Sequence, residues 1–94
     1  MKFIEYRGMK IFIAPGRRVF TKIGEPDKVL GTARQAQRVW LLRIPNHEWD
    51  VTPDMPVARL NRIAGAKIKK VPVLGFPSWQ ACAKEIDRVI GGAK

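Results

Sequence analysis

The dipeptide Pro15-Gly16 is the feature that most constrains the local fold, because it separates two runs of strand-forming residues. Residues 9–14 read Met-Lys-Ile-Phe-Ile-Ala, and residues 17–23 read Arg-Arg-Val-Phe-Thr-Lys-Ile. β-Branched and aromatic residues favour strands, and Pro-Gly is a strong turn signal. The sequence therefore predicts an antiparallel hairpin over residues 9–23. Residues 3–6 extend the β-rich region toward the N-terminus, with a turn or bulge at Arg7-Gly8.

The middle of the chain is predicted to contain a short strand and two helices. Residues 28–31 read as a third strand, and Thr32 is a suitable N-cap for a helix over residues 33–44. At helical spacing, one face of that helix carries Ala33, Ala36, Trp40 and Ile44, and Arg34 and Arg38 lie opposite. A shorter helix is expected from Pro56 to Ala64, closed by Gly65.

The last third of the chain predicts an edge strand and a helix. Residues 67–75 contain Pro72, which cannot donate to a sheet ladder, and three lysines, which discourage edge-to-edge association. The final helix begins after the cap Ser78, carries an apolar stripe from Trp79 to Ile90, and ends at Gly91-Gly92.

These elements predict one α+β domain spanning residues 1–94: a small antiparallel sheet (an N-terminal hairpin plus short strands) packed against two main helices and a short third helix. The tripeptide Val-Leu-Gly occurs at residues 29–31 and again at 73–75, each time before a predicted helix. Either a duplicated strand-helix unit or chance accounts for this repetition.

The charge of the chain indicates the class of partner. Eighteen Lys and Arg oppose eight Asp and Glu, which gives a formal net charge of +10. Such an excess weakens the compact state through self-repulsion, so it indicates a polyanionic target. No signal peptide or membrane-spanning run is evident, the charge is not concentrated on one amphipathic helix, and the single cysteine fits a reducing compartment. A cytoplasmic protein without a membrane role is expected.

No motif in the sequence specifies a reaction, so we expect no enzymatic activity, no cofactor and no small-molecule substrate. Cys82 lies on the apolar stripe of the final helix and is expected to be a buried hydrophobe, not part of a Cys-His pair. The loop around His47, Glu48 and Asp50, with Asp54 beyond it, could serve a small metal-dependent nuclease. A solvated loop that holds no metal is the simpler interpretation.

The basic side chains predict a nucleic-acid-binding protein, with DNA favoured over RNA as the partner. Arginine offers bidentate contacts to phosphate or guanine, and a small sheet can enter a major groove. The predicted contacts lie at the hairpin, on the 33–44 helix and in the lysine-rich strand: Arg17, Arg18, Lys22, Arg34, Arg38, Lys67, Lys69 and Lys70. Tyr6, Phe12 and Phe20 could stack on the bases of a single strand, although core positions are commoner for aromatics at strand spacing.

A second hypothesis is a protein-binding inhibitor or adaptor that docks on an acidic or nucleic-acid-binding surface of a host complex. Trp40 and Trp79 fit core positions, whereas Trp49 lies in a polar loop and could be an exposed anchor. Arg59 and Arg62 would then contribute to the rim of that interface.

The first half of the chain resembles a known class of DNA-binding module. The resemblance lies in Tyr6-Arg7-Gly8, residues 17–20 and residues 29–31, followed by a helix whose Ala36 and Trp40 face the sheet. This arrangement is similar to the three-stranded-sheet-plus-helix modules of the AP2-like and integrase arm-binding type. This resemblance implies a sheet that lies in the major groove. The small size and basicity also resemble phage accessory proteins, a group that includes regulators and anti-CRISPR inhibitors of host defence.

Overall fold

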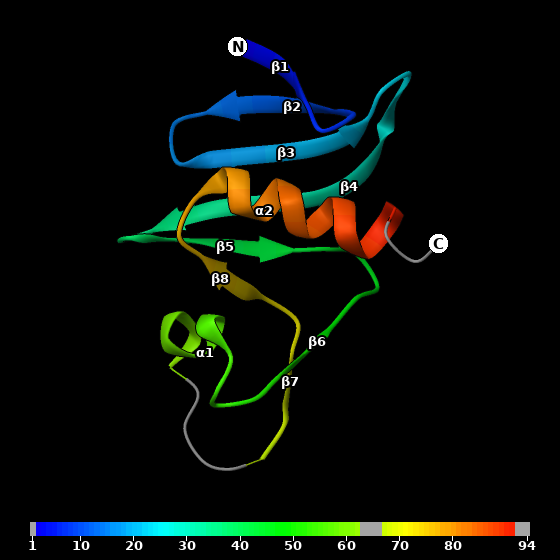
Figure 1. Cartoon of the computed structure of the whole chain (residues 1–94). Coiled ribbons are helices and arrows are strands. Elements are labelled where there is room, and N and C mark those ends of the chain that lie inside the picture. Colours follow the sequence, from blue (N-terminus) through cyan, green and yellow to red (C-terminus); the bar gives the residue numbers. More distant parts are fainter. Residues whose placement is uncertain (1, 63–66, 92–94) are drawn as a thin grey trace.

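A six-stranded antiparallel sheet forms most of the computed structural model, which describes residues 2–62 and 67–91 (Figure 1). Its strands lie in the order β1-β2-β3-β4-β5-β8. Their bounds are Lys2–Tyr6 for β1, Met9–Ala14 for β2, Arg17–Lys22 for β3, Glu25–Ala36 for β4, Val39–Arg43 for β5 and Leu74–Phe76 for β8. The first five strands are joined in sequence order by short turns, so the sheet is built from successive hairpins.

Both predicted N-terminal turns are confirmed. Ala14 pairs with Arg17 across Pro15-Gly16, and Tyr6 pairs with Met9 across Arg7-Gly8. Arg7 and Gly8 both have positive φ angles, 53° and 77°, which are the angles of the two-residue turn that matches strand twist. The strand predicted over residues 28–31 is part of a longer strand, β4, which begins at Glu25. The pairing of β4 with β3 shifts register opposite Phe20 and Thr21.

The predicted helix over residues 33–44 is wrong: this segment forms the end of β4, a turn at Gln37-Arg38, and β5. In strand geometry Trp40, Leu42 and Ile44 alternate with Leu41 and Arg43, and the first three are buried. The hairpin pairs with β3 on one side and with β8 on the other, and a short helix without such partners is only marginally stable.

The final helix covers one face of the sheet (Figure 1). Helix α2, Trp79–Ile86, begins after Ser78, whose hydroxyl accepts a hydrogen bond from the Ala81 amide, and continues as the π-helical turn η1, Asp87–Gly91. It approaches closely at Gly31, where an added Cβ would lie 2.9 Å from Ile86 Cδ1. Phe20, Ile11, Leu42, Cys82 and Ile86 form the centre of the core between sheet and helix.

The segment between β5 and β8 forms a smaller unit beside the sheet. Strand β6, Trp49–Val51, pairs with β7, Lys69–Val71, and helix α1, Pro56–Asn61, lies between them in the sequence. Helix α1 packs against β8: Asn61 Oδ1 accepts a hydrogen bond from the Gly75 amide at 2.9 Å. The predicted ends of helices at residues 63–65 and at Gly92 lie outside the described residues.

The predicted edge strand over 67–75 is two strands in two different sheets. Pro72 separates them, so the lysines lie in β7 and beside it, while β8 is the edge of the main sheet. The α+β class is confirmed, but the chain is mostly strand and does not have two main helices. The two Val-Leu-Gly segments are not equivalent units, since only the second is followed by a helix.

In residues 2–62 and 67–91, no helix combines the length and apolar character needed to cross a lipid bilayer.

Candidate nucleic-acid interface

The face of the sheet opposite α2 carries the candidate site. Side chains alternate between the two faces of a strand, and the strand register fixes which residues share a face. Residues Met9, Phe20, Ala33 and Leu42 face α2 and are buried. Their neighbours along each strand form what we call the open face: Phe3, Glu5, Lys10, Phe12, Arg17, Val19, Thr21, Thr32, Arg34, Leu41 and Arg43.

Three arginines lie together on the open face, on β3, β4 and β5, and we call them the arginine cluster: Arg17, Arg34 and Arg43. Arg17 on β3 is the direct cross-strand partner of Arg34 on β4, and Arg43 on β5 is the partner of Thr32 on β4. All three are exposed and line one hollow of about 330 Å³, together with the apolar side chains Val19 and Leu41. Residues 17–22 and 32–36 and strand β5 contain no acidic residue.

None of these arginines forms an ion pair within the described residues. The ion pairs found there join Arg7 to Asp87, Lys22 to Glu25 and Arg88 to Glu85. Like charges on directly opposed strand positions destabilise a sheet. The Arg17–Arg34 arrangement therefore costs folding free energy that a bound anion would recover.

The positive surface continues from the arginine cluster to β7. Arg43 also lines a second hollow of about 460 Å³, which Lys70, Pro72 and Glu48 share. Lys70 lies opposite Asp50 in the β6–β7 pair, so acidic groups partly balance the charge here. Lys67 and Lys69 are exposed on the same segment. The predicted second contact zone is thus connected to the first through Arg43.

Two aromatic rings lie at the other end of the open face. Phe3, 54% exposed, and Phe12 are cross-strand partners whose ring centroids are 5.3 Å apart. The Lys10 ammonium lies 4.9 Å from the Phe3 ring centroid. The pairing continues from Phe12 to Val19, Thr32 and Arg43, so one row across five strands joins the aromatic rings to the arginine cluster.

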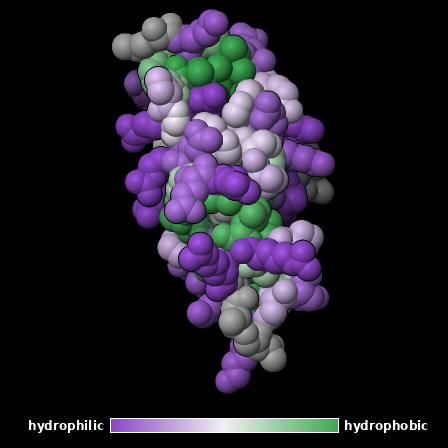
Figure 2. Space-filling view, turned by 90° about the vertical axis from the view of Figure 1, so that its left-hand side faces the viewer, coloured by the Kyte–Doolittle hydropathy of each residue, from purple (hydrophilic) through white to green (hydrophobic). Residues whose placement is uncertain are grey.

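The other predicted nucleic-acid contacts are not on the open face. Arg18 points toward α2, with its guanidinium carbon 5.0 Å from the Trp40 ring centroid and 5.4 Å from that of Trp79. Lys22 Nζ lies 2.7 Å from Glu25 Oε2 at the far end of β3. Arg38 lies in the β4–β5 turn and lines a hollow with Arg62, the residue that follows α1, so Arg34 and Arg38 do not form the expected helical pair. Figure 2 views the side where the β2–β3 and β4–β5 turns lie, and hydrophilic side chains extend along its whole height.

Sequence reasoning missed Arg43 and Lys10 as members of this surface. Arg43 falls within the predicted helix over residues 33–44, although its alternation with the apolar residues Leu42 and Ile44 is a strand signal. Lys10 alternates in the same way with the buried Met9 and Ile11.

The second hypothesis expected an exposed anchor at Trp49, but the Trp49 side chain is buried. It is 6% exposed, and its indole N–H donates to Glu85 Oε2 at 2.5 Å. Burial raises the pKa of Glu85, but hydrogen bonds from Arg88 and Trp49 lower it by more, so the net pKa is below the ordinary value. The period-two pattern Trp49-Asp50-Val51, with both apolar residues buried, is the signal that identifies this short strand. Arg59 and Arg62 are exposed, on α1 and just after it.

The two candidate reactive residues, His47 and Cys82, have different surroundings. The His47 ring packs edge-on against Trp49 at 4.8 Å, and Glu48 and Asp50 are exposed. Within the described residues, no three His, Cys, Asp or Glu side chains are grouped so that they could hold a metal ion. Cys82 is fully buried, as predicted, and burial raises its pKa to about 12.

Comparison with protein-family models, with curated proteins and with solved structures finds no match for this chain. The order of hairpin, strand and helix that carried the resemblance to AP2-like modules does not occur, because residues 33–44 form strands.

Proposed function

We propose that the chain is a non-enzymatic nucleic-acid-binding protein that uses the open face of its sheet. The arginine cluster would hold phosphates, Lys70 would extend the contact, and Phe3 and Phe12 would stack on bases. DNA is the favoured partner. This assignment retains Arg17, Arg34 and the β7 lysines from the sequence prediction and adds Arg43 and Lys10.

The observation that carries the proposal is the direct pairing of Arg17 with Arg34 among strand segments, residues 17–22, 32–36 and 39–43, that contain no acidic residue. Folding alone does not favour this arrangement. Arginine forks match the oxygen geometry of phosphate, and each phosphate that they neutralise releases counterions.

The width of the sheet favours a single strand over a duplex groove. Six strands at ~4.8 Å spacing span roughly 24 Å. A B-DNA major groove is about 12 Å wide and admits a helix or a two-stranded ribbon. Stacking of bases on exposed aromatic rings beside a basic surface is the usual way in which proteins bind single strands.

The test is fluorescence anisotropy with labelled single-stranded and double-stranded DNA of about 20 nucleotides, at salt concentrations from about 50 to about 200 mM. The proposal predicts tighter binding of the single strand and a steep fall of affinity with salt. Single-stranded RNA of the same sequence measures the preference for DNA. No binding, or binding that does not respond to salt, would contradict the proposal.

The second candidate function, docking on an acidic or nucleic-acid-binding protein, has one observation in its favour. Arg38 and Arg62 line a hollow of about 710 Å³ together with Val39 and Leu60. Arginine beside apolar side chains is typical of protein interfaces. Retention of one defined protein from nuclease-treated lysate, and its loss in an Arg38→Glu, Arg62→Glu variant, would support this function. Retention that disappears with nuclease treatment would instead support nucleic-acid binding.

A further inference from the structure

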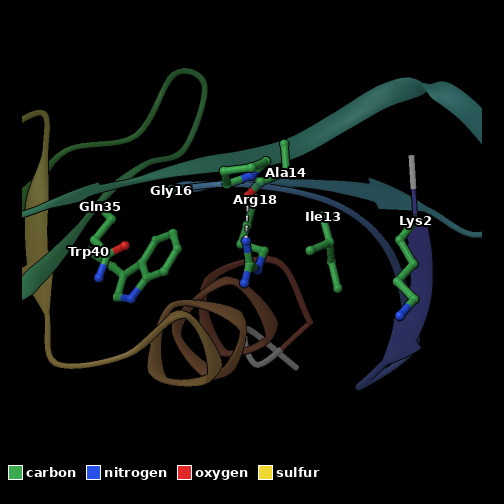
Figure 3. Close-up of a pocket in the computed structure, with 8 residues that line it drawn as sticks. Lys2, Ile13, Ala14, Gly16, Arg18, Gln35 and Trp40 are labelled. Carbon is green, nitrogen blue, oxygen red and sulfur yellow. Dashed lines mark hydrogen bonds between the residues drawn. The ribbon is translucent and has the colours of Figure 1, made fainter.

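A separate cationic hollow lies on the other side of the sheet, beside α2 (Figure 3). Its volume is about 590 Å³, in the range of small-molecule sites. The lining residues come from β1, the β2–β3 hairpin, β4 and β5: Lys2, Ile13, Ala14, Pro15, Gly16, Arg18, Gln35 and Trp40. Figure 3 shows Arg18 between the sheet and the helix, with Trp40 beside it.

Arg18 is held in place from several directions. Its Nη1 donates to the carbonyl oxygens of Ala14, at 2.8 Å, and Arg17, at 2.7 Å. Its guanidinium also lies against the rings of Trp40 and Trp79, and Tyr6 packs edge-on against Trp79 with centroids 5.5 Å apart. The side chain is therefore positioned before any ligand arrives, which reduces the entropic cost of binding.

The same guanidinium has unused donors. Within the described residues, Nε is buried without a hydrogen-bond partner, and Nη2 makes no hydrogen bond. Nε has almost no exposed surface, so an anion in the hollow would bond to Nη2.

The hollow is cationic. Lys2 and Arg18 both line it, and no acidic residue is among the described residues that do so. Gln35 adds an uncharged amide at the rim, and Ile13 and Trp40 add apolar surface. Two cations beside an apolar wall suit a dianion that carries an organic group.

We propose that this hollow binds a phosphate monoester the size of a nucleoside monophosphate. Arg18 and Lys2 contact the phosphate, and the wall formed by Ile13 and Trp40 contacts the organic part. The ligand is either a free mononucleotide or the terminal 5′-phosphate of a nucleic-acid strand, since both present the same group. The Arg18 guanidinium lies on the α2 side of the sheet, opposite the open face.

Tryptophan fluorescence offers a direct test. Trp40 and Trp79 adjoin Arg18, whereas Trp49 is paired with Glu85. In a Trp49→Phe background, titration with adenosine 5′-monophosphate is expected to change the emission saturably, and adenosine without phosphate is expected to have no effect. Calorimetry on the wild-type chain gives the affinity independently.

Gln35→Glu is the decisive variant, because it places a carboxylate in the hollow at an exposed position and leaves Arg18 packed. Affinity for adenosine 5′-monophosphate is expected to fall about tenfold or more. Gln37→Glu is the matched control: it makes the same charge change in the β4–β5 turn, outside this hollow, and is expected to bind like the wild type. Lys2→Gln should weaken binding by a smaller factor, and Arg18→Gln should abolish it if the variant folds.

Two oligonucleotides of one sequence, with and without a 5′-phosphate, distinguish the end of a nucleic-acid strand from a free mononucleotide as the ligand. Stronger binding of the phosphorylated strand that Gln35→Glu removes identifies a strand terminus, and binding of the mononucleotide alone identifies a free ligand. Failure of both probes, or equal binding by the Gln35→Glu and Gln37→Glu variants, overturns the inference. Loss of open-face binding in an Arg17→Gln, Arg34→Gln variant leaves this site intact, so the two proposals fail separately.

Discussion

Arg17 and Arg34 are direct cross-strand partners on adjoining strands of the open face. Two guanidinium groups at such positions repel each other, and no carboxylate pairs with either within the described residues. We predict that Arg34→Gln raises the free energy of unfolding by about 0.5 kcal/mol while it weakens nucleic-acid binding. Urea denaturation and fluorescence anisotropy measure the two effects.

Arg43→Gln is the control for that variant, since the cross-strand partner of Arg43 is Thr32. It should weaken nucleic-acid binding and leave stability nearly unchanged. The gain in stability from Arg34→Gln should also shrink in high salt, where repulsion between exposed charges is screened. A loss of stability in Arg34→Gln would show that the pair is not repulsive.

The contact between Gly31 and Ile86 fixes the position of α2 on the sheet. An added Cβ at Gly31 would lie 2.9 Å from Ile86 Cδ1 and 3.2 Å from the Arg43 carbonyl oxygen. Gly31→Ala is expected to destabilise the fold by about 1–3 kcal/mol through overpacking. Thermal unfolding of Gly31→Ala with and without Ile86→Val tests the cause, because shortening Ile86 should recover part of the loss. Strictly additive effects would argue against direct contact.

The hydrogen bond from Trp49 to Glu85 predicts a dependence of stability on acid. The pKa of Glu85 is lower in the folded chain than its ordinary value of 4.5. The ionised carboxylate therefore stabilises the fold above about pH 4.5, and this contribution is lost as the pH falls through the folded-state pKa. Glu85→Gln should lower stability by about 1 kcal/mol at neutral pH, with a difference that narrows toward about pH 3.

Urea titrations over that pH range, followed by tryptophan fluorescence, provide the measurement. Glu48→Gln is the control, because Glu48 is exposed and takes part in no ion pair within the described residues. A constant difference between wild type and Glu85→Gln at every pH would contradict the role of the charge.

Cys82 is expected to be inert in the folded chain. It is fully buried, and burial raises its pKa to about 12, so little thiolate exists near neutral pH. Reaction with a thiol reagent at about pH 8 should proceed at the rate of unfolding and accelerate in parallel with urea-induced loss of structure. Rapid reaction of the native chain would show that the helix does not cover the sheet at this position.

The strength of local signals explains which elements the sequence predicted. Pro15-Gly16 and Arg7-Gly8 specify turns by their own backbone preferences, and Ser78 caps a helix with its own hydroxyl. These elements depend on neighbours in the sequence. The hairpin over residues 32–43 depends on pairing with β3 on one side and β8 on the other. Strand β8 lies far from this hairpin in the sequence. Ala33, Ala36, Trp40 and Ile44 also satisfy a helical period, so periodicity alone did not decide between the two structures.

The same limit applies to the site. Arg17 and Arg18 are adjacent in the sequence, and the prediction grouped them, yet consecutive strand residues point to opposite faces. Arg17 belongs to the open face, whereas the Arg18 guanidinium lies on the α2 side, against Trp40 and Trp79. The division of charge between two faces could be recognised only after the strand register was known. Trp49 is a related case, because its indole N–H donates to Glu85, which is 36 residues away in the sequence.

The most direct test of the open-face proposal compares two triple variants with the same net charge. Arg17→Gln, Arg34→Gln, Arg43→Gln removes the arginine cluster, and Lys22→Gln, Lys28→Gln, Lys84→Gln removes three exposed cations elsewhere. In salt titrations of single-stranded DNA binding, the first variant should lose about tenfold or more in affinity, and its slope should fall by about 2. The second should stay close to the wild type. Equal losses in both variants would show that total charge, and not the open face, determines binding.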